Sequence, residues 1–165
     1  MYSIRQFQSA DWPSLWPILQ SVFAAGDTYA FSPTSTEAEI HSAWVTLPQS
    51  TFVATTGAGA VIGTYILKPN QPGLGSHVCN CGYVVAESAR GQGVAAALCE
   101  HSQAQARTLG YRAMQFNLVV STNAVAVRLW QKLGFAIVGT LPGAFRHSQL
   151  GYVDAYVMHK TLFAA

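Results

Sequence analysis

A glycine-rich stretch that runs directly into a predicted helix constrains this chain more than any other feature. Residues 87–98 read ESARGQGVAAAL, and the alanines and leucine after the second glycine favour a helix. Glycine destabilises a helix interior by about 1 kcal/mol, so glycines at this boundary serve another purpose. At a helix start they let a ligand approach free backbone N–H groups, and phosphate suits such a terminus. The stretch therefore predicts a site for a phosphorylated ligand.

Two familiar phosphate-binding patterns fit this stretch poorly. A P-loop needs Gly-Lys-Ser or Gly-Lys-Thr, whereas Gly93 is followed by Val-Ala. A dinucleotide fingerprint is matched by Gly91, Gly93 and Ala96, but the strand expected at 111–120 has no Asp or Glu to hold a ribose. A third pattern, R-x-x-G-x-G/A, is satisfied from Arg90 onwards. A tight turn would explain Gly91 alone, so a ligand-binding loop is the better interpretation.

Hydrophobic periodicity divides the rest of the chain into elements that follow one another without a linker. The prolines at 13 and 17 predict a short or irregular first helix, and residues 142–150 are expected to be a connection. The order of elements predicts one α/β domain over residues 1–165 around a mixed sheet. Strands are expected at 2–7, 50–56, 60–68, 76–86, 111–120, 135–141 and 151–162, and helices at 9–25, 36–47, 91–109 and 121–134.

Composition and charge exclude several classes of function. The net charge is +2 and the basic residues form no stripe, so we expect no nucleic-acid partner. No apolar run approaches the roughly 18 residues of a membrane span, and the first ten residues lack a signal-peptide core, so we expect a cytoplasmic protein. Cys79, Cys81 and Cys99 have no zinc-site spacing, so we expect no metal and reduced, buried thiols. Only 10% of residues are charged, which leaves apolar surface that would suit a homodimer.

Two motifs, in order and about 30 residues apart, carry a family resemblance. GYVVAESARGQGVAAAL (82–98) looks like the CoA-binding motif of the GNAT superfamily of acetyl-CoA-dependent N-acetyltransferases, and STNAVAVRLWQKLGF (121–135) looks like its second signature. The resemblance covers nearly the whole chain. It implies a single-domain GNAT-like α/β fold, with a mixed, mostly antiparallel sheet of six to seven strands and about four helices. It also implies acetyl transfer by direct attack of an amine within a ternary complex, without a cysteine nucleophile.

The resemblance assigns acetyl-CoA to one continuous segment and one helix start. The strand before the loop would pair its backbone with the pantetheine arm as an added strand does, and the loop would hold the pyrophosphate at a helix N-terminus. Asn123 matches a residue that contacts the cofactor in many members, although it would also serve as a plain N-cap. The expected cofactor-binding residues are Tyr83, Val84, Val85, Arg90, Gly91, Gln92, Gly93, Val94, Ala95 and Asn123.

The chain departs from the family where acid–base chemistry is expected. Many relatives have a tyrosine as general acid where this chain has Trp130, whose indole donates but does not titrate, so core packing is the better interpretation. Residues 69–86 contain no Asp or Glu to act as general base. His77 is the imidazole on that strand and is the candidate base, with a water relay as the alternative. Tyr152, near the last strand, is the second catalytic candidate and would otherwise line the acceptor cleft.

The acceptor is expected to be a small amine. FNLVVSTN followed by GYVDAYVM resembles a branch that acetylates small amines or amino-acid-like compounds, and the even charge offers no acidic groove for a basic protein tail. Tyr29, Asn117 and Asp154 are the substrate-binding candidates, each with surface or sheet packing as an alternative. Asn117 is expected to be a buried amide in a sheet covered on both faces. Acetylation of protein amino groups, or a non-catalytic CoA sensor, are the alternative functions.

Overall fold

A computed structural model describes residues 2–163 and contains one seven-stranded sheet of order β1-β2-β3-β4-β5-β7-β6. β4 and β5 run parallel, and the other neighbouring strands are antiparallel. The predicted mixed, mostly antiparallel sheet is therefore confirmed. The strands are β1 (Tyr2–Gln6), β2 (Ser50–Thr56), β3 (Val61–Pro69), β4 (Val78–Val85), β5 (Ala113–Val120), β6 (Ala136–His147) and β7 (Gly151–Thr161).

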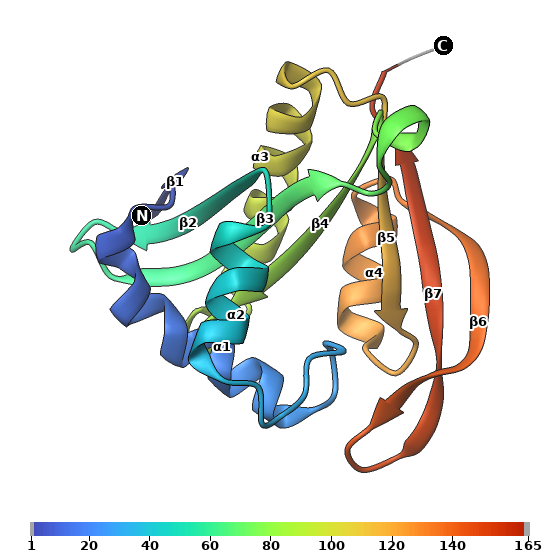
Figure 1. Ribbon diagram of the computed structural model, residues 1–165, viewed down its shortest axis with the longest axis horizontal. Coiled ribbons are helices and arrows are strands. Elements are labelled where there is room, and N and C mark those ends of the chain that lie inside the picture. The colour runs from blue at the N-terminus through green and yellow to red at the C-terminus, as the bar shows by residue number, and fades with distance from the viewer. Residues whose placement is uncertain (1, 164–165) are drawn as a thin grey trace.

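Four α-helices cover the sheet, two on each face. The helices α1 (Trp12–Ala25) and α2 (Glu37–His41), the latter extended by a π-helical turn over Ser42–Thr46, lie on one face (Figure 1). The helices α3 (Val94–Thr108) and α4 (Ala124–Lys132) lie on the opposite face. Within residues 2–163, no helix is both long and apolar enough to cross a membrane.

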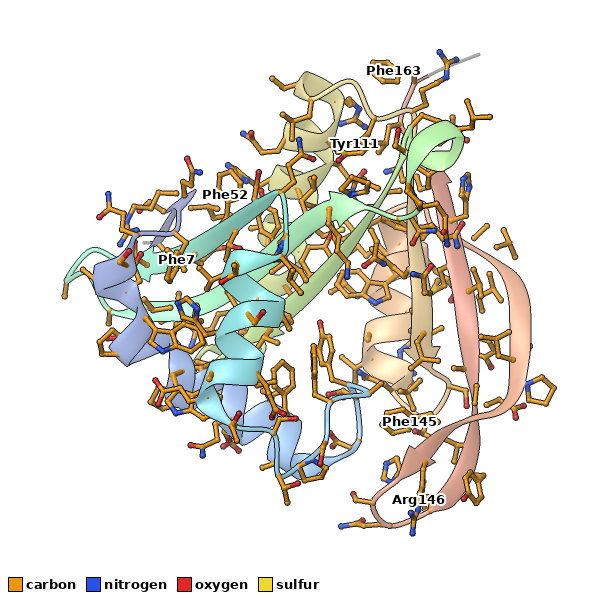
Figure 2. The ribbon with its side chains drawn as sticks, viewed as in Figure 1. Phe7, Phe52, Tyr111, Phe145, Arg146 and Phe163 are labelled. Atoms are coloured by element: carbon orange, nitrogen blue, oxygen red, sulfur yellow. The ribbon has the colours of Figure 1, made fainter. Side chains whose placement is uncertain are left out.

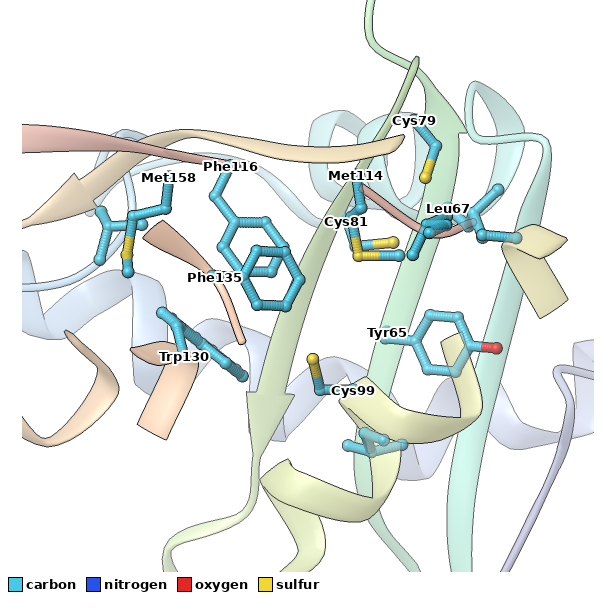
Figure 3. Close-up of a cluster of buried hydrophobic side chains, with 14 of the residues drawn as sticks. Tyr65, Leu67, Cys79, Cys81, Cys99, Met114, Phe116, Trp130, Phe135 and Met158 are labelled. Atoms are coloured by element: carbon cyan, nitrogen blue, oxygen red, sulfur yellow. The ribbon is translucent and has the colours of Figure 1, made fainter. Parts of the chain in front are cut away.

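The two faces of the sheet carry separate hydrophobic cores. On the α1 side, Leu15, Leu19 and Trp44 are fully buried against β2, β3 and β4. On the α3 side, Cys99 and Trp130 belong to a second cluster (Figure 3). The three cysteines are free and buried, as the sequence predicts. Trp130 packs against Tyr83, with ring centroids 5.1 Å apart, and this agrees with its expected packing role.

The first helix is longer and more regular than its prolines predict. Pro13 occupies the first turn, where the missing N–H has no helical partner to lose. Pro17 lies inside the helix and removes one hydrogen bond, yet α1 continues to Ala25. Leu19 and Phe23, both almost fully buried, hold the helix on the sheet. Tertiary packing therefore outweighs the local cost of Pro17.

The sixth strand is longer than predicted. Residues 142–150 were expected to join two strands, but β6 continues to His147 and bends. The pairing register with β7 shifts between Leu141 and Phe145, and the Gly143 N–H donates to Asp154 Oδ1 over 2.9 Å. This side-chain bond satisfies a backbone donor at the irregular turn, so Pro142 and Gly143 interrupt the ladder without ending the strand.

Candidate active site between β4 and β5

The site begins where two parallel strands separate. β4 and β5 pair only at Val78 with Ala113 and at Cys79 with Met114, and beyond these pairs they diverge (Figure 1). Asn80 bridges the start of the gap, because its Nδ2 donates to the Gln115 carbonyl over 2.9 Å. The gap leaves one edge of β4 without a strand partner over its second half.

The alternation of hydrogen bonds along β4 decides which backbone groups face this gap. In an antiparallel pair, residues that bond to the partner strand alternate with residues that bond away from it. The Ala86 N–H donates to the Ile62 carbonyl over 2.9 Å, and the same register places Val84 in a bonded pair with β3. The backbone groups of Tyr83 and Val85 therefore point into the gap. Of the three predicted pantetheine-pairing residues, Tyr83 and Val85 have backbone groups without a strand partner, whereas Val84 bonds to β3 and its side chain is buried in the α1-side core.

The glycine-rich loop leaves its backbone open. Gly91 and Gly93 have φ of +75° and +79°, which side chains other than glycine rarely adopt. A Cβ built on either glycine meets nothing within 4 Å, so the space in front of the backbone is free. Gly93 is the N-cap of α3, and no side chain caps this helix start. The first N–H groups of the 15-residue helix are thus available to an anion, as the sequence predicts for the segment ending at Ala95.

The remaining predicted cofactor residues lie around the same opening. Arg90 lies in extended backbone before the glycines and lines a cavity that occupies the gap between β4 and β5. Gln92 Nε2 donates to the Ser88 carbonyl over 2.9 Å, so this side chain braces the loop. Asn123 is an N-cap, because its side chain accepts from the Ala126 N–H, and it also lines the cavity, while its contact with the cofactor stays a prediction. An anionic, extended cofactor fits this cradle of open backbone and uncapped helix start.

A cavity of about 610 Å³ occupies the gap and extends to the face covered by α1 and α2. Its far wall is aromatic: Tyr29, Phe31 and Trp44 line it, and Tyr29 packs against Phe23 and Trp44 at centroid distances of 5.2 and 5.8 Å. The Tyr29 hydroxyl donates over 2.8 Å to the Tyr83 carbonyl, which has no strand partner on this side. Tyr29, a predicted substrate residue, therefore connects this aromatic wall to β4.

The charges around the cavity are few and positive. Lys68 and Arg90 line it, and no Asp, Glu or His among residues 2–163 does so. Burial raises the pKa of Tyr29, of Tyr83 and of the Cys81 thiol well above their ordinary values, so all three are neutral at physiological pH. These groups can donate hydrogen bonds, but none of them is a base near neutral pH.

Asn117 lines the cavity but is not the buried amide that the sequence predicts. No helix covers this part of the α1 face, and the side chain is exposed. Its Oδ1 accepts from Gln115 Nε2 over 3.0 Å, and its Nδ2 donates to Asn70 Oδ1 over 2.7 Å. The amide thus has partners without a ligand, and its substrate-binding role stays a prediction.

Three of the predicted catalytic and substrate residues do not reach the cavity lining. His77 is exposed just before β4, and its carbonyl accepts from the Arg112 N–H over 2.8 Å. Tyr152 is 76% exposed on β7. Asp154 is exposed, and one of its carboxylate oxygens holds the bend of β6. The catalytic roles of His77 and Tyr152 and the substrate role of Asp154 stay predictions without a contact in this structure.

Sequence reasoning missed three polar residues that line the cavity: Thr28, Lys68 and Asn80. Asn80 carries a weak signal, because it is a polar side chain in an otherwise apolar strand. Lys68 lies next to the last residue of β3 and Thr28 lies in a loop, and polar residues are ordinary in both places. Their place in the cavity depends on tertiary structure that local patterns do not report.

A second cavity, of about 460 Å³, lies beside the first, between the loop after α1 and the β6–β7 hairpin. The two cavities share Tyr29, Ala30 and Phe31. Phe145 and Arg146 lie on the hairpin arm that projects from the sheet (Figure 2). The hairpin is fastened to the end of α1, because Ser148 donates to the Gly26 carbonyl through its N–H and to the Ala25 carbonyl through its hydroxyl.

Sequence comparison relates the chain to acetyltransferases. The model of the Acetyltransferase (GNAT) family matches residues 2–135. N-acetyltransferase aca1 of Schizosaccharomyces pombe is 38% identical over 99 residues. That match covers 59% of this chain and 47% of the relative, so the chain spans about half the length of that protein.

Solved structures agree with this relationship. A GCN5-related N-acetyltransferase from Kribbella flavida is 44% identical, with a TM-score of 0.92 and 97% of each chain covered. A phosphinothricin acetyltransferase from Sinorhizobium meliloti in complex with AcCoA is 21% identical, with a TM-score of 0.86, 97% of this chain and 88% of that chain covered, and it supports the fold alone. With two motifs in register and a family match over most of its length, the chain belongs to the GNAT acetyltransferase family.

Proposed function

We propose that this chain transfers an acetyl group from acetyl-CoA to the primary amine of a small molecule. The observation that carries the proposal is the open edge of β4, which leads directly to the uncapped, glycine-fronted start of α3. Tyr83 and Val85 would pair with the pantetheine arm, and residues 90–95 would hold the pyrophosphate. Acetyl-CoA supplies the acetyl group as a thioester.

The transfer needs little acid–base chemistry from side chains. The amine nitrogen forms the new C–N bond as the C–S bond breaks, and the amine gives up a proton while CoA leaves as the thiol. Because the lining has no carboxylate or imidazole, we propose that a water molecule, oriented by backbone carbonyls, takes this proton and passes it to the departing sulfur. The main contribution of the chain is then to orient the two reactants, which is itself a large source of rate enhancement.

The shape of the acceptor side favours a small molecule over a protein tail. The hydrogen bonds of Ser148 to the end of α1 close one end of the cleft that an extended peptide would have to cross. The aromatic wall with Tyr29 and Trp44 suits an apolar acceptor body. Asn117 remains the proposed group for binding the acceptor, and Asp154, Tyr152 and His77 are alternatives that require the segments carrying them to move to the cavity.

The test is release of free thiol from acetyl-CoA over a panel of small amines, amino acids and amino-terminal peptides. Turnover of small amines with higher kcat/KM than peptides supports the proposal. Preference for peptides would support a protein acetyltransferase. If calorimetry detects acetyl-CoA binding but no amine is turned over, the result would support the non-catalytic sensor. That alternative is retained because the lining has no side-chain base and because Trp130 replaces the usual tyrosine acid.

We also propose that the protein is cytoplasmic and forms a homodimer. The cytoplasm is a reducing compartment, and it suits a protein with three buried free thiols. The edge strand β6 has no charged residue from Ala136 to Phe145, and Val138 is 61% exposed there, so a second copy is the natural cover. Val138→Lys should shift the sedimentation equilibrium toward monomer, whereas the control Leu74→Lys, at a fully exposed leucine elsewhere, should not. A monomeric wild type would contradict the homodimer.

A further inference from the structure

Thr28 presents a polar atom that the folded chain leaves unsatisfied. Its hydroxyl oxygen is shielded from solvent and has no hydrogen-bond partner, and it is the only buried side-chain oxygen or nitrogen of this kind within residues 2–163. Thr28 also lines the main cavity. Buried polar groups in folded proteins are nearly always paired, so an unpaired one beside a cavity needs an explanation.

Other buried hydroxyls of this chain show how regular pairing is. Thr51 donates to the Trp44 carbonyl over 2.6 Å, and Thr64 donates to the Phe52 carbonyl over 2.8 Å. Ser102 donates to the Cys99 carbonyl over 2.8 Å. Thr28 is the exception among them, and it is the one that lies on the acceptor side of the cavity.

The position of Thr28 is well determined by its neighbours. It follows Gly26, which ends α1 with φ of +64°, and it precedes Tyr29, whose hydroxyl is bonded to the Tyr83 carbonyl. Ser148 fastens the hairpin to the same end of α1. Contacts on both sides therefore fix the backbone of the loop at Thr28, so Thr28 is not part of a freely moving loop.

The surroundings of Thr28 define what its hydroxyl can meet. The same wall of the cavity is apolar, with Val22, Phe31, Trp44 and Ile66. The charged groups that line the cavity are cationic, so a second cation on the acceptor would be repelled. An oxygen on an otherwise apolar acceptor would satisfy Thr28 without opposing these charges.

We propose that Thr28 is a specificity-determining residue: its half-buried side chain turns about Cα–Cβ, which breaks no hydrogen bond, and its hydroxyl then donates to an oxygen-bearing group of the acceptor, such as a carboxylate, a carboxamide or a hydroxyl. The inference rests on the proposed acetylation of a small amine and narrows it to apolar amines that carry such an oxygen. A site built around a hydrogen-bonding group discriminates strongly against analogues that lack the partner.

The test compares Thr28→Val and Thr28→Ser with matched acceptor pairs. Each pair consists of an apolar α-amino acid and the amine with the same side chain but no carboxylate. The wild type should prefer the oxygen-bearing member, and Thr28→Val should reduce this ratio of kcat/KM values at least ten-fold. Thr28→Ser keeps the hydroxyl and should retain the preference, and the KM for acetyl-CoA should stay unchanged in both variants.

Stability separates recognition from a structural role. Valine has nearly the shape of threonine and no unpaired hydroxyl, so Thr28→Val should melt at or above the wild-type temperature. Thr55→Val, at a buried hydroxyl that is bonded to Ser3 far from the cavity, should melt lower and keep the acceptor preference. If Thr28 recognises the acceptor, only Thr28→Val of these two variants should keep or gain stability while it loses the acceptor preference.

Three results would overturn the inference. An unchanged acceptor ratio in a more stable Thr28→Val would mean that the hydroxyl reads nothing. An equal loss for both members of each pair, with a lower melting temperature, would mean that Thr28 is structural. If the wild type acetylates no amine of the panel, the proposed function fails and this inference fails with it. In the first two cases the wild type is active, so the three results can be told apart.

Discussion

The two walls of the proposed site, one for the cofactor and one for the acceptor, are built in different ways. The cofactor wall is backbone from one continuous segment, residues 83–95, in which glycines and an uncapped helix start expose N–H groups. The acceptor wall consists of side chains from separate elements, with Thr28 and Tyr29 after α1, Trp44 after α2 and Asn117 on β5. Backbone recognition suits a ligand that is common to a family, whereas side-chain recognition can change with the acceptor. A variant on one wall should therefore leave the other ligand unaffected.

The largest expected effect is on the cofactor wall. Gly93→Val places a β-branched side chain at φ of +79° and in the open space before α3. We expect acetyl-CoA affinity to fall at least 100-fold by calorimetry, which corresponds to about 2.8 kcal/mol. The change combines backbone strain with loss of access to the helix start.

Gly59→Val is the matched control for this strain. Gly59 has φ of +85° and equally open surroundings, but it lies in the β2–β3 turn, away from the cavity. Both variants should lose similar thermal stability, and only Gly93→Val should lose acetyl-CoA. Unchanged affinity in a folded Gly93→Val protein would contradict the assignment of the cofactor wall.

The same contrast explains how far the sequence could be interpreted. The order of strands and helices, the loop from Arg90 to Ala95 and the cap at Asn123 follow from local rules of periodicity, glycine and capping, and the structure has each of them in place. The length of α1 could not be predicted, because Pro17 is outweighed by packing. The length of β6 could not be predicted either, because a distant carboxylate, Asp154, holds its bend.

The acceptor wall resisted prediction for a physical reason. Thr28, Lys68 and Asn80 come together only when the loop after α1 folds over the gap between β4 and β5. Asn117 was assigned to the correct strand, but its exposure depends on which part of the sheet the helices leave uncovered. Such facts belong to the assembled sheet and have no short sequence pattern.

A smaller effect is expected from Asn117→Ala on the acceptor wall. If the acceptor uses this amide, its kcat/KM should fall about ten-fold, or about 1.4 kcal/mol, while the KM for acetyl-CoA stays fixed. Stability should change by less than about 0.5 kcal/mol, because the side chain is exposed.

Asn70→Ala removes the outer partner of Asn117 without touching the cavity lining, so it serves as the control. It should affect the acceptor less than Asn117→Ala does. If Asn117→Ala keeps its acceptor kinetics and clearly loses thermal stability, Asn117 is a structural amide. It would then not belong to the side chains that bind the acceptor.

The smallest effect is expected from His77→Ala. This side chain does not line the cavity, and none of the residues that do is a base near neutral pH, since burial raises the pKa values of Tyr29, Tyr83 and Cys81. The amine must then lose its proton to water, so kcat/KM should rise with pH as the free acceptor deprotonates.

The midpoint of this rise should follow the pKa of the acceptor. It should lie roughly two pH units higher for an alkylamine with pKa about 10 than for an α-amine with pKa about 8. His77→Ala should leave both profiles in place. A midpoint that is the same for both acceptors, and that disappears in His77→Ala, would instead make this histidine the base and require the loop before β4 to reach the cavity during turnover.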